Sequence, residues 1–153
     1  MIMLSACLAG VNCKYNGGSN LNPVFQEMIN DGNVILVCPE ELGGLPIPRS
    51  PSEISGGTGE AVLSGQARVV NKEGEDVTSF FITGAKGAVT IARLTGVEQA
   101  ILRRRSPSCG CGEIYDGTFS SKLQSGDGVA AALLKKHGIK VISDEEYLEV
   151  LNK

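Results

Sequence analysis

The residues in this 153-residue sequence with the greatest potential for chemistry are its five cysteines, Cys7, Cys13, Cys38, Cys109 and Cys111. An odd number of cysteines in a chain that we expect to stay in the reducing cytoplasm argues against a framework of structural disulfides and favours metal or redox chemistry. Cys7, Cys38 and Cys109 each follow a short apolar run. These three thiols are therefore the first candidates for a shared site.

The three apolar runs, residues 1–6, 34–37 and 99–102, are typical of strands buried on both faces of a parallel sheet. Residues 140–142 predict a further strand. Helical patterns and end signals predict helices between these strands, at residues 22–31, 78–94 and 127–137, and a last one after Ser143. A short strand is expected at residues 67–71. We expect residues 42–65, rich in proline and glycine, to form an irregular loop.

Strand and helix thus alternate along the chain, which predicts an α/β fold. We expect residues 1–153 to form a single domain with a mainly parallel sheet flanked by helices, in a Rossmann-like three-layer arrangement. The order of the strands within the sheet does not follow from the sequence. Ligands bind beyond the carboxyl ends of the strands in such sheets. The fold would therefore bring Cys7, Cys38 and Cys109 into one crevice.

The spacing of the cysteines bears on which metal they would hold. Structural zinc sites usually take ligands from tight C-x(2–4)-C pairs, whereas Cys7 and Cys13 lie farther apart in the sequence than this and Cys109 and Cys111 lie closer. An iron-sulfur cluster tolerates scattered single cysteines, since several loops can bind its different corners. Zinc remains a weaker alternative. Buried cysteines with no function at all are a further one, because cysteine is among the most buried residue types.

Several sequence blocks resemble the 2-thiouracil desulfurase family, and the resemblance extends over essentially the whole chain. The blocks are residues 5–15 (SACLAGVNCKY), 38–49 (CPEELGGLPIPR), 105–110 (RSPSCG), 114–119 (IYDGTF) and 127–131 (DGVAA). The resemblance implies an enzyme that replaces the carbon-sulfur bond of a thiolated pyrimidine by a carbon-oxygen bond. It also implies an oxygen-sensitive 4Fe-4S cluster held by three cysteines, with the fourth iron open to sulfur.

Carried onto this sequence, the resemblance implies roles for individual residues. Cys7, Cys38 and Cys109 would be the cluster ligands, with Cys13 as an alternate for one of them. Two further positions are catalytic in this interpretation, Glu40 as the acid/base carboxylate and Ser106 as a hydroxyl that orients substrate or relays a proton. Arg49 and Ser108 would contact the substrate. Cys111 stands where serine is frequent in the family, which makes it a possible additional ligand.

Composition and charge exclude several classes of partner. Fourteen lysines and arginines against seventeen aspartates and glutamates give a net charge of −3. Such a chain is not suited to neutralising the phosphates of DNA. No apolar run is long enough to span a membrane, and the N-terminal residues lack a basic region, so we expect a soluble, cytoplasmic protein.

The expected partners are a small thiolated heterocycle and an acceptor for the released sulfide. The sequence does not decide whether the heterocycle is a free base, a nucleotide or part of an RNA, nor the oligomeric state. A different functional class also stays open at this stage. The chain could be a non-catalytic carrier or sensor whose cluster or thiols serve sulfur relay or redox signalling. Glu40 and Ser106, close in sequence to two of the cysteines, favour the enzyme, since a carrier needs no acid/base pair.

Overall fold

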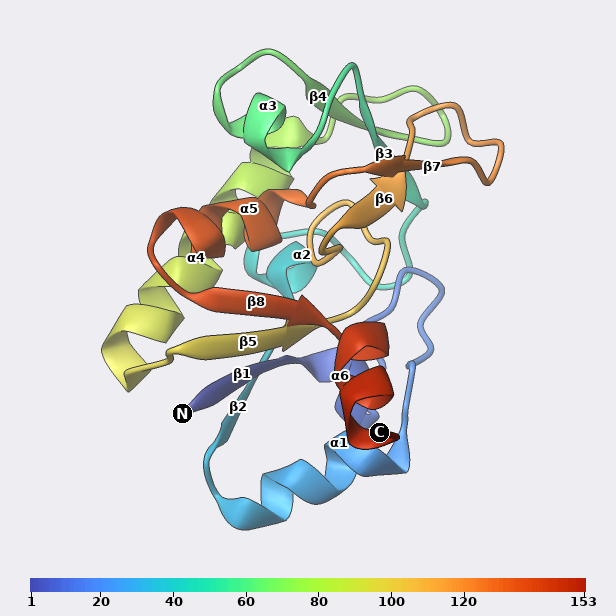
Figure 1. The fold of residues 1–153 in the computed structure, drawn as a ribbon. Coiled ribbons are helices and arrows are strands. Elements are labelled where there is room, and N and C mark those ends of the chain that lie inside the picture. The colour runs from blue at the N-terminus through green and yellow to red at the C-terminus, as the bar shows by residue number, and fades with distance from the viewer.

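A four-stranded parallel sheet forms the centre of the protein, in a computed structural model that describes residues 1–153 (Figure 1). Its strand order is β2-β1-β5-β8. The bounds are β1 Ile2–Ser5, β2 Val34–Val37, β5 Gln99–Leu102 and β8 Lys140–Ser143. All neighbouring strands are parallel. The four strands predicted from apolar runs are thus confirmed, and the structure supplies their order.

Helices cover both faces of this sheet. They are α1 (Pro23–Met28), α2 (Pro39–Leu42), α3 (Gly59–Leu63), α4 (Thr78–Thr95), α5 (Val129–Lys136) and α6 (Asp144–Leu151), with 3-10 turns η1 (Ala6–Ala9) and η2 (Ile29–Asp31). Met3 of β1 packs with α4 and α5, whereas the next residue, Leu4, packs with Phe25 of α1 and Tyr147 of α6. This alternation confirms the three-layer α/β architecture. None of the helices combines the length and apolar composition that a membrane crossing needs.

The helix ends follow the signals in the sequence. Asn22 caps α1, its Oδ1 accepting the backbone N–H of Val24 at 3.0 Å, and Pro23 is the first helical residue. Gly96 ends α4 in a left-handed conformation with φ of 68°. Ser143 caps α6, its Oγ accepting the N–H of Glu146 at 3.0 Å. These contacts satisfy backbone groups that helix ends otherwise leave unpaired.

The prediction of an irregular loop at residues 42–65 is wrong in part. This segment contains β3 (Ser52–Ser55) and α3, and β3 pairs antiparallel with β4 (Arg68–Asn71). A second antiparallel pair, β6 (Glu113–Tyr115) with β7 (Leu123–Ser125), was not expected either. Ile54 and Val62 are buried in a cluster with Phe81 of α4. These short elements are therefore stabilised by tertiary packing, which local sequence signals do not report.

Two glycines allow α2 to pack directly against α4. A Cβ atom on Gly84 of α4 would overlap the carbonyl oxygen of Pro39, and one on Gly43 would overlap the carbonyl oxygen of Phe80. The two backbones are therefore in contact at this point. Because α2 follows Cys38 directly and contains Glu40, the contact fixes the position of both residues relative to α4.

We expect Gly84→Ala to lower the free energy of unfolding by about 1–3 kcal/mol, since the new methyl group meets backbone that cannot move aside. Gly87→Ala, in the same helix, is the matched control. A Cβ there lies 3.5 Å from its nearest neighbour, Leu42, so the gain in helix propensity should stabilise the protein by up to about 1 kcal/mol. Urea denaturation measures both changes. Equal stabilities of the two variants would contradict the close contact.

Candidate functional site

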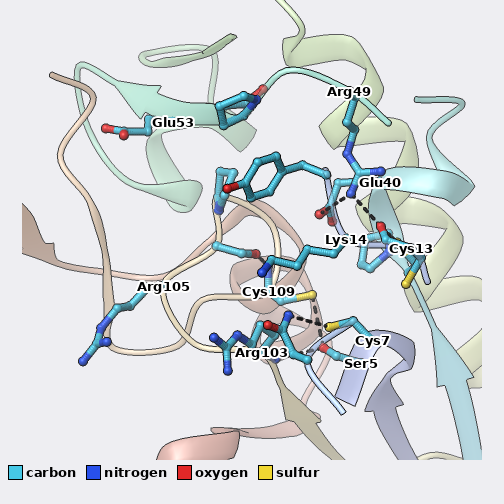
Figure 2. Close-up of a pocket in the computed structure, with 18 of the residues that line it drawn as sticks. Ser5, Cys7, Cys13, Lys14, Glu40, Arg49, Glu53, Arg103, Arg105 and Cys109 are labelled. Carbon is cyan, nitrogen blue, oxygen red and sulfur yellow. Dashed lines mark hydrogen bonds and ion pairs between the residues drawn. The ribbon is translucent and has the colours of Figure 1, made fainter. Parts of the chain in front are cut away.

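One pocket at the carboxyl ends of the central strands collects four of the five cysteines. The pocket has a volume of about 470 Å³, and Cys7, Cys13, Cys38 and Cys109 line it. Cys7 lies in η1 directly after β1, Cys38 directly after β2, and Cys109 in the loop that leaves β5. These three strands are neighbours in the sheet. The convergence expected from the sequence is therefore present, and Figure 2 shows Cys7, Cys13 and Cys109 reaching the same pocket.

The fifth cysteine lies elsewhere. Cys111 packs against the hydrophobic core between the sheet and α5, and its Sγ lies 3.4 Å from the carbonyl oxygen of Val141, to which the thiol donates. It does not line the pocket. The structure thus separates Cys111 from the other four thiols.

Cys109 is positioned by a tight turn that Ser106 stabilises. The Oγ of Ser106 accepts the backbone N–H groups of Cys109 at 2.7 Å and of Ser108 at 3.2 Å. The turn rests on the start of α5, where the N–H of Ala131 donates to the carbonyl oxygen of Ser108 at 3.0 Å. A Cβ on Gly128, the residue before α5, would lie 2.6 Å from the same oxygen. Ser106 itself lines the pocket, and no residue of the chain accepts its hydroxyl proton.

Glu40, on α2, also lines the pocket, and two donors hold its carboxylate. The Nη2 of Arg49 lies 3.3 Å from Oε2, and the hydroxyl of Ser108 donates to Oε1. The same Arg49 nitrogen donates to the carbonyl oxygen of Cys13 at 2.9 Å. The guanidinium is therefore shared between Glu40 and the segment that carries Cys13 (Figure 2).

The two residues predicted to contact substrate are placed differently. Arg49 lines the pocket with a side chain that is only 8% exposed, while its charge is paired with Glu40. Ser108 is fully buried and does not line the pocket. Its hydroxyl touches the carboxylate of Glu40, so any influence of Ser108 on a substrate passes through that carboxylate.

The environment shifts the pKa values of the pocket thiols in opposite directions. Burial raises the pKa of Cys109 and that of Cys7. The thiols of Cys13 and Cys38 interact directly. A hydrogen bond from the Cys13 thiol stabilises the thiolate of Cys38, which lowers the pKa of Cys38 and raises the pKa of Cys13. Cys38 is therefore the thiol that ionises first in the metal-free protein.

The pocket is rimmed by cations, three of them from the sequence run Arg103, Arg104 and Arg105. Asp144, at the start of α6 and 1% exposed, binds two of them. Its Oδ2 lies 3.1 Å from Nη1 of Arg103, and its Oδ1 accepts the backbone N–H of Arg104 at 2.8 Å. Glu145 forms a further ion pair with Arg104 at 2.8 Å. The arginine run thus joins the end of β5 to the start of α6.

Sequence reasoning missed three polar residues at the site. Ser5 and Asn20 contact cysteine sulfurs, and Asp144 holds the arginines. Only Ser5 carried a visible signal, since it is the one polar residue within the first apolar run. Glu53, which the sequence suggested could line the pocket or pair with Arg49, does line it, but Arg49 pairs with Glu40 and Glu53 accepts the backbone N–H groups of Gly117 and Phe119.

Comparisons with known proteins agree with the resemblance seen in the sequence. The family model described as 2-thiouracil desulfurase matches residues 2–146. The chain is 45% identical over 151 residues to a Bacillus subtilis (strain 168) protein described as uncharacterized protein YbbK, covering 99% of this chain and 100% of the other. A solved structure described as the [4Fe-4S]-dependent thiouracil desulfidase TudS superimposes with a TM-score of 0.84 at 38% identity. That match covers 97% of this chain and 93% of the other.

We expect iodoacetamide to modify Cys38 first when the metal-free protein is treated at a pH below the ordinary thiol pKa of about 8.5. Cys38 has the lowered pKa and so retains the largest reactive thiolate fraction, whereas the other four thiols, whose pKa values are raised, should react later. Mass spectrometry of peptides measures the order. Cys13→Ala, which removes the donor, should move the reactivity of Cys38 to higher pH, and a difference in accessibility alone would not do this. Uniform reactivity of the folded thiols would contradict the assignment.

Proposed function

The chain is an enzyme that belongs to the 2-thiouracil desulfurase family, and on this premise we propose that it removes sulfur from a thiolated pyrimidine by hydrolytic exchange at a 4Fe-4S cluster. One observation carries the proposal. Three thiols from three separate strand ends and the carboxylate of Glu40 open into the same pocket. The pocket thus contains both soft metal ligands, the cysteine thiolates, and a carboxylate that can accept and donate protons.

The donor set fits an iron-sulfur cluster. The pocket offers four cysteine sulfurs and no imidazole, since the single histidine, His137, lies at the end of α5. Soft thiolate ligands favour iron-sulfur clusters, Cu(I) and zinc over harder ions. The relative named as a [4Fe-4S]-dependent desulfidase has the same fold. We infer that the cluster is the resident group of this pocket.

Cys7, Cys38 and Cys109 are the ligands we propose. Each follows a strand of the central sheet, so the most rigid part of the molecule positions it. Cys13 is only 2% exposed, and its thiol interacts with that of Cys38. We assign Cys13 a supporting role beside Cys38. Zinc would have a different set of ligands available, because the ligand atoms of Cys13, Cys38 and Glu41 lie within 4.8 Å of one another.

When bound, the cluster supplies an iron that acts as a Lewis acid toward the sulfur of a thiocarbonyl group. Glu40 would take a proton from the attacking water. Each carboxylate oxygen of Glu40 accepts one hydrogen bond from the protein, so one lone pair on each remains for this water. Arg49 and Ser108 hold the carboxylate in place. A general base of this kind typically contributes about 10²- to 10⁴-fold to the rate.

Ser106 completes the proposed constellation. Its oxygen accepts two backbone N–H groups, and its own proton is free to be donated to a substrate atom in the pocket. In the net reaction, water supplies the new carbonyl oxygen and the sulfur leaves as hydrogen sulfide or passes to an acceptor. No electrons are gained or lost in this exchange. An acid/base pair in the pocket, together with the family, favours an enzyme over the sulfur carrier or redox sensor considered from the sequence.

Serine substitution tests the ligand assignment. Cys7→Ser, Cys38→Ser and Cys109→Ser, purified without oxygen, should each lose most of the iron, whereas the wild type binds about four irons per chain. Cys111→Ser is the control and should retain the wild-type iron content, because its thiol lies outside the pocket. Iron and labile-sulfide assays decide. Loss of iron in Cys13→Ser with retention in Cys7→Ser would replace Cys7 by Cys13 in the ligand set.

Glu40→Gln tests the acid/base assignment. We expect the variant to keep its iron and to release sulfide from 2-thiouracil about 10²- to 10⁴-fold more slowly, since an amide cannot accept the proton. Glu60→Gln is the control. Glu60 is an exposed helical glutamate of α3 that does not line the pocket. A Glu40→Gln variant with wild-type turnover would remove Glu40 from the mechanism.

A further inference from the structure

Two polar side chains with no part in the proposed reaction direct hydrogen-bond donors at cysteine sulfurs. The hydroxyl of Ser5, the last residue of β1, lies 3.4 Å from Sγ of Cys109. The Nδ2 of Asn20 lies 3.4 Å from Sγ of Cys7. Ser5 is 2% exposed and sits within an otherwise apolar strand. A buried hydroxyl at such a position requires partners.

The partners of Ser5 fix the direction of its proton. Its Oγ accepts the backbone N–H of Arg103 at 2.9 Å, so that lone pair is already used. The sulfur of Cys109 is the one acceptor within reach of its proton. Ser108 also lies near this sulfur, but a hydroxyl has one proton and that of Ser108 goes to Glu40. Ser5 is therefore the side-chain donor to Cys109 (Figure 2).

This arrangement is rigid at both ends. Ser5 ends β1, and Arg103 directly follows β5, its neighbour in the sheet. The side chain of Arg103 is bound in turn by the buried carboxylate of Asp144. The three groups join in a chain from the N–H of Arg103 through the hydroxyl of Ser5 to the sulfur of Cys109. The hydroxyl of Ser5 cannot rotate away from Cys109 without breaking the hydrogen bond that it accepts from the backbone N–H of Arg103.

We propose that Ser5 and Asn20 are positioning residues that set the reduction potential of the cluster through hydrogen bonds to the sulfurs of Cys109 and Cys7. The inference rests on the proposed function, because it takes these two cysteines as ligands. A hydrogen bond to a thiolate disperses its negative charge. The reduced cluster carries one more negative charge than the oxidised one, so the donors stabilise it more. Removing either donor makes reduction harder.

Redox titration of anaerobically purified protein, followed by electron paramagnetic resonance, tests this inference. Ser5→Ala and Asn20→Ala should each shift the midpoint potential of the cluster to a more negative value than in the wild type. Ser5→Thr keeps the hydroxyl and should restore the wild-type value. Ser50→Ala is the control, because Ser50 lines the same pocket but the hydrogen bonds to cysteine sulfurs come from other residues. A purely structural role of Ser5 would not produce this pattern.

The iron content and the midpoint potentials distinguish a failure of this inference from a failure of the proposed function. Wild-type protein without iron would overturn the proposed function, and this inference with it. If the cluster is present but its midpoint potential in both Ser5→Ala and Asn20→Ala equals that of the wild type, the inference alone is overturned. If Ser5→Ala does not retain a cluster, Ser5→Thr and Asn20→Ala decide, since Asn20 lies in a loop outside the sheet. An unshifted Asn20→Ala would then count against the inference.

Discussion

The parallel pairing of β1 with both β2 and β5 is the constraint on which the rest of the structure depends. Ser5 pairs with Val37, and Leu4 pairs with Ile101, so all three strands end at the same level. Cys38 directly follows β2, Cys7 lies two residues beyond the end of β1, and Cys109 follows β5 after a short turn. Side chains alternate between the two faces of a strand. A slip of β1 by one residue would therefore turn Met3 toward α1 and Leu4 toward α4 and α5, each away from the residues it packs against. The burial of these side chains thus also fixes where the thiols lie.

Electrostatic pairing at the pocket depends on the same strand ends. Asp144 binds the arginines that leave β5, and Arg49 binds Glu40 on the helix that follows β2. Both ion pairs are largely withdrawn from solvent, where a carboxylate without its partner would be costly. The pocket therefore holds thiols, a carboxylate and guanidinium groups in fixed places. Fixed polar groups of this kind contribute to catalysis because they need no reorganisation during the reaction.

The sequence was most informative where the chemistry was local. The four central strands, the cap at Asn22 and the convergence of Cys7, Cys38 and Cys109 could all be predicted, because each depends on a short pattern and on the rule that parallel strands end at one edge. The strand expected at residues 67–71 is present as β4, but its antiparallel partner β3 could not be predicted, since packing against Phe81 stabilises it. The same holds for Asn20 and Asp144, which bind groups 13 and 40 positions away along the chain. Contacts of that kind depend on loop paths that no local pattern encodes.

The contact between Asp144 and the arginines also has a consequence for how the pocket is assembled. Cys7 and Cys38 follow strands that pair directly with each other, β1 and β2. The segment that leaves β5 toward Cys109 is held instead by Asp144, which lies 40 positions beyond Arg104 in the sequence. Completion of the thiol pocket therefore depends on the docking of β8 and the start of α6 against β5.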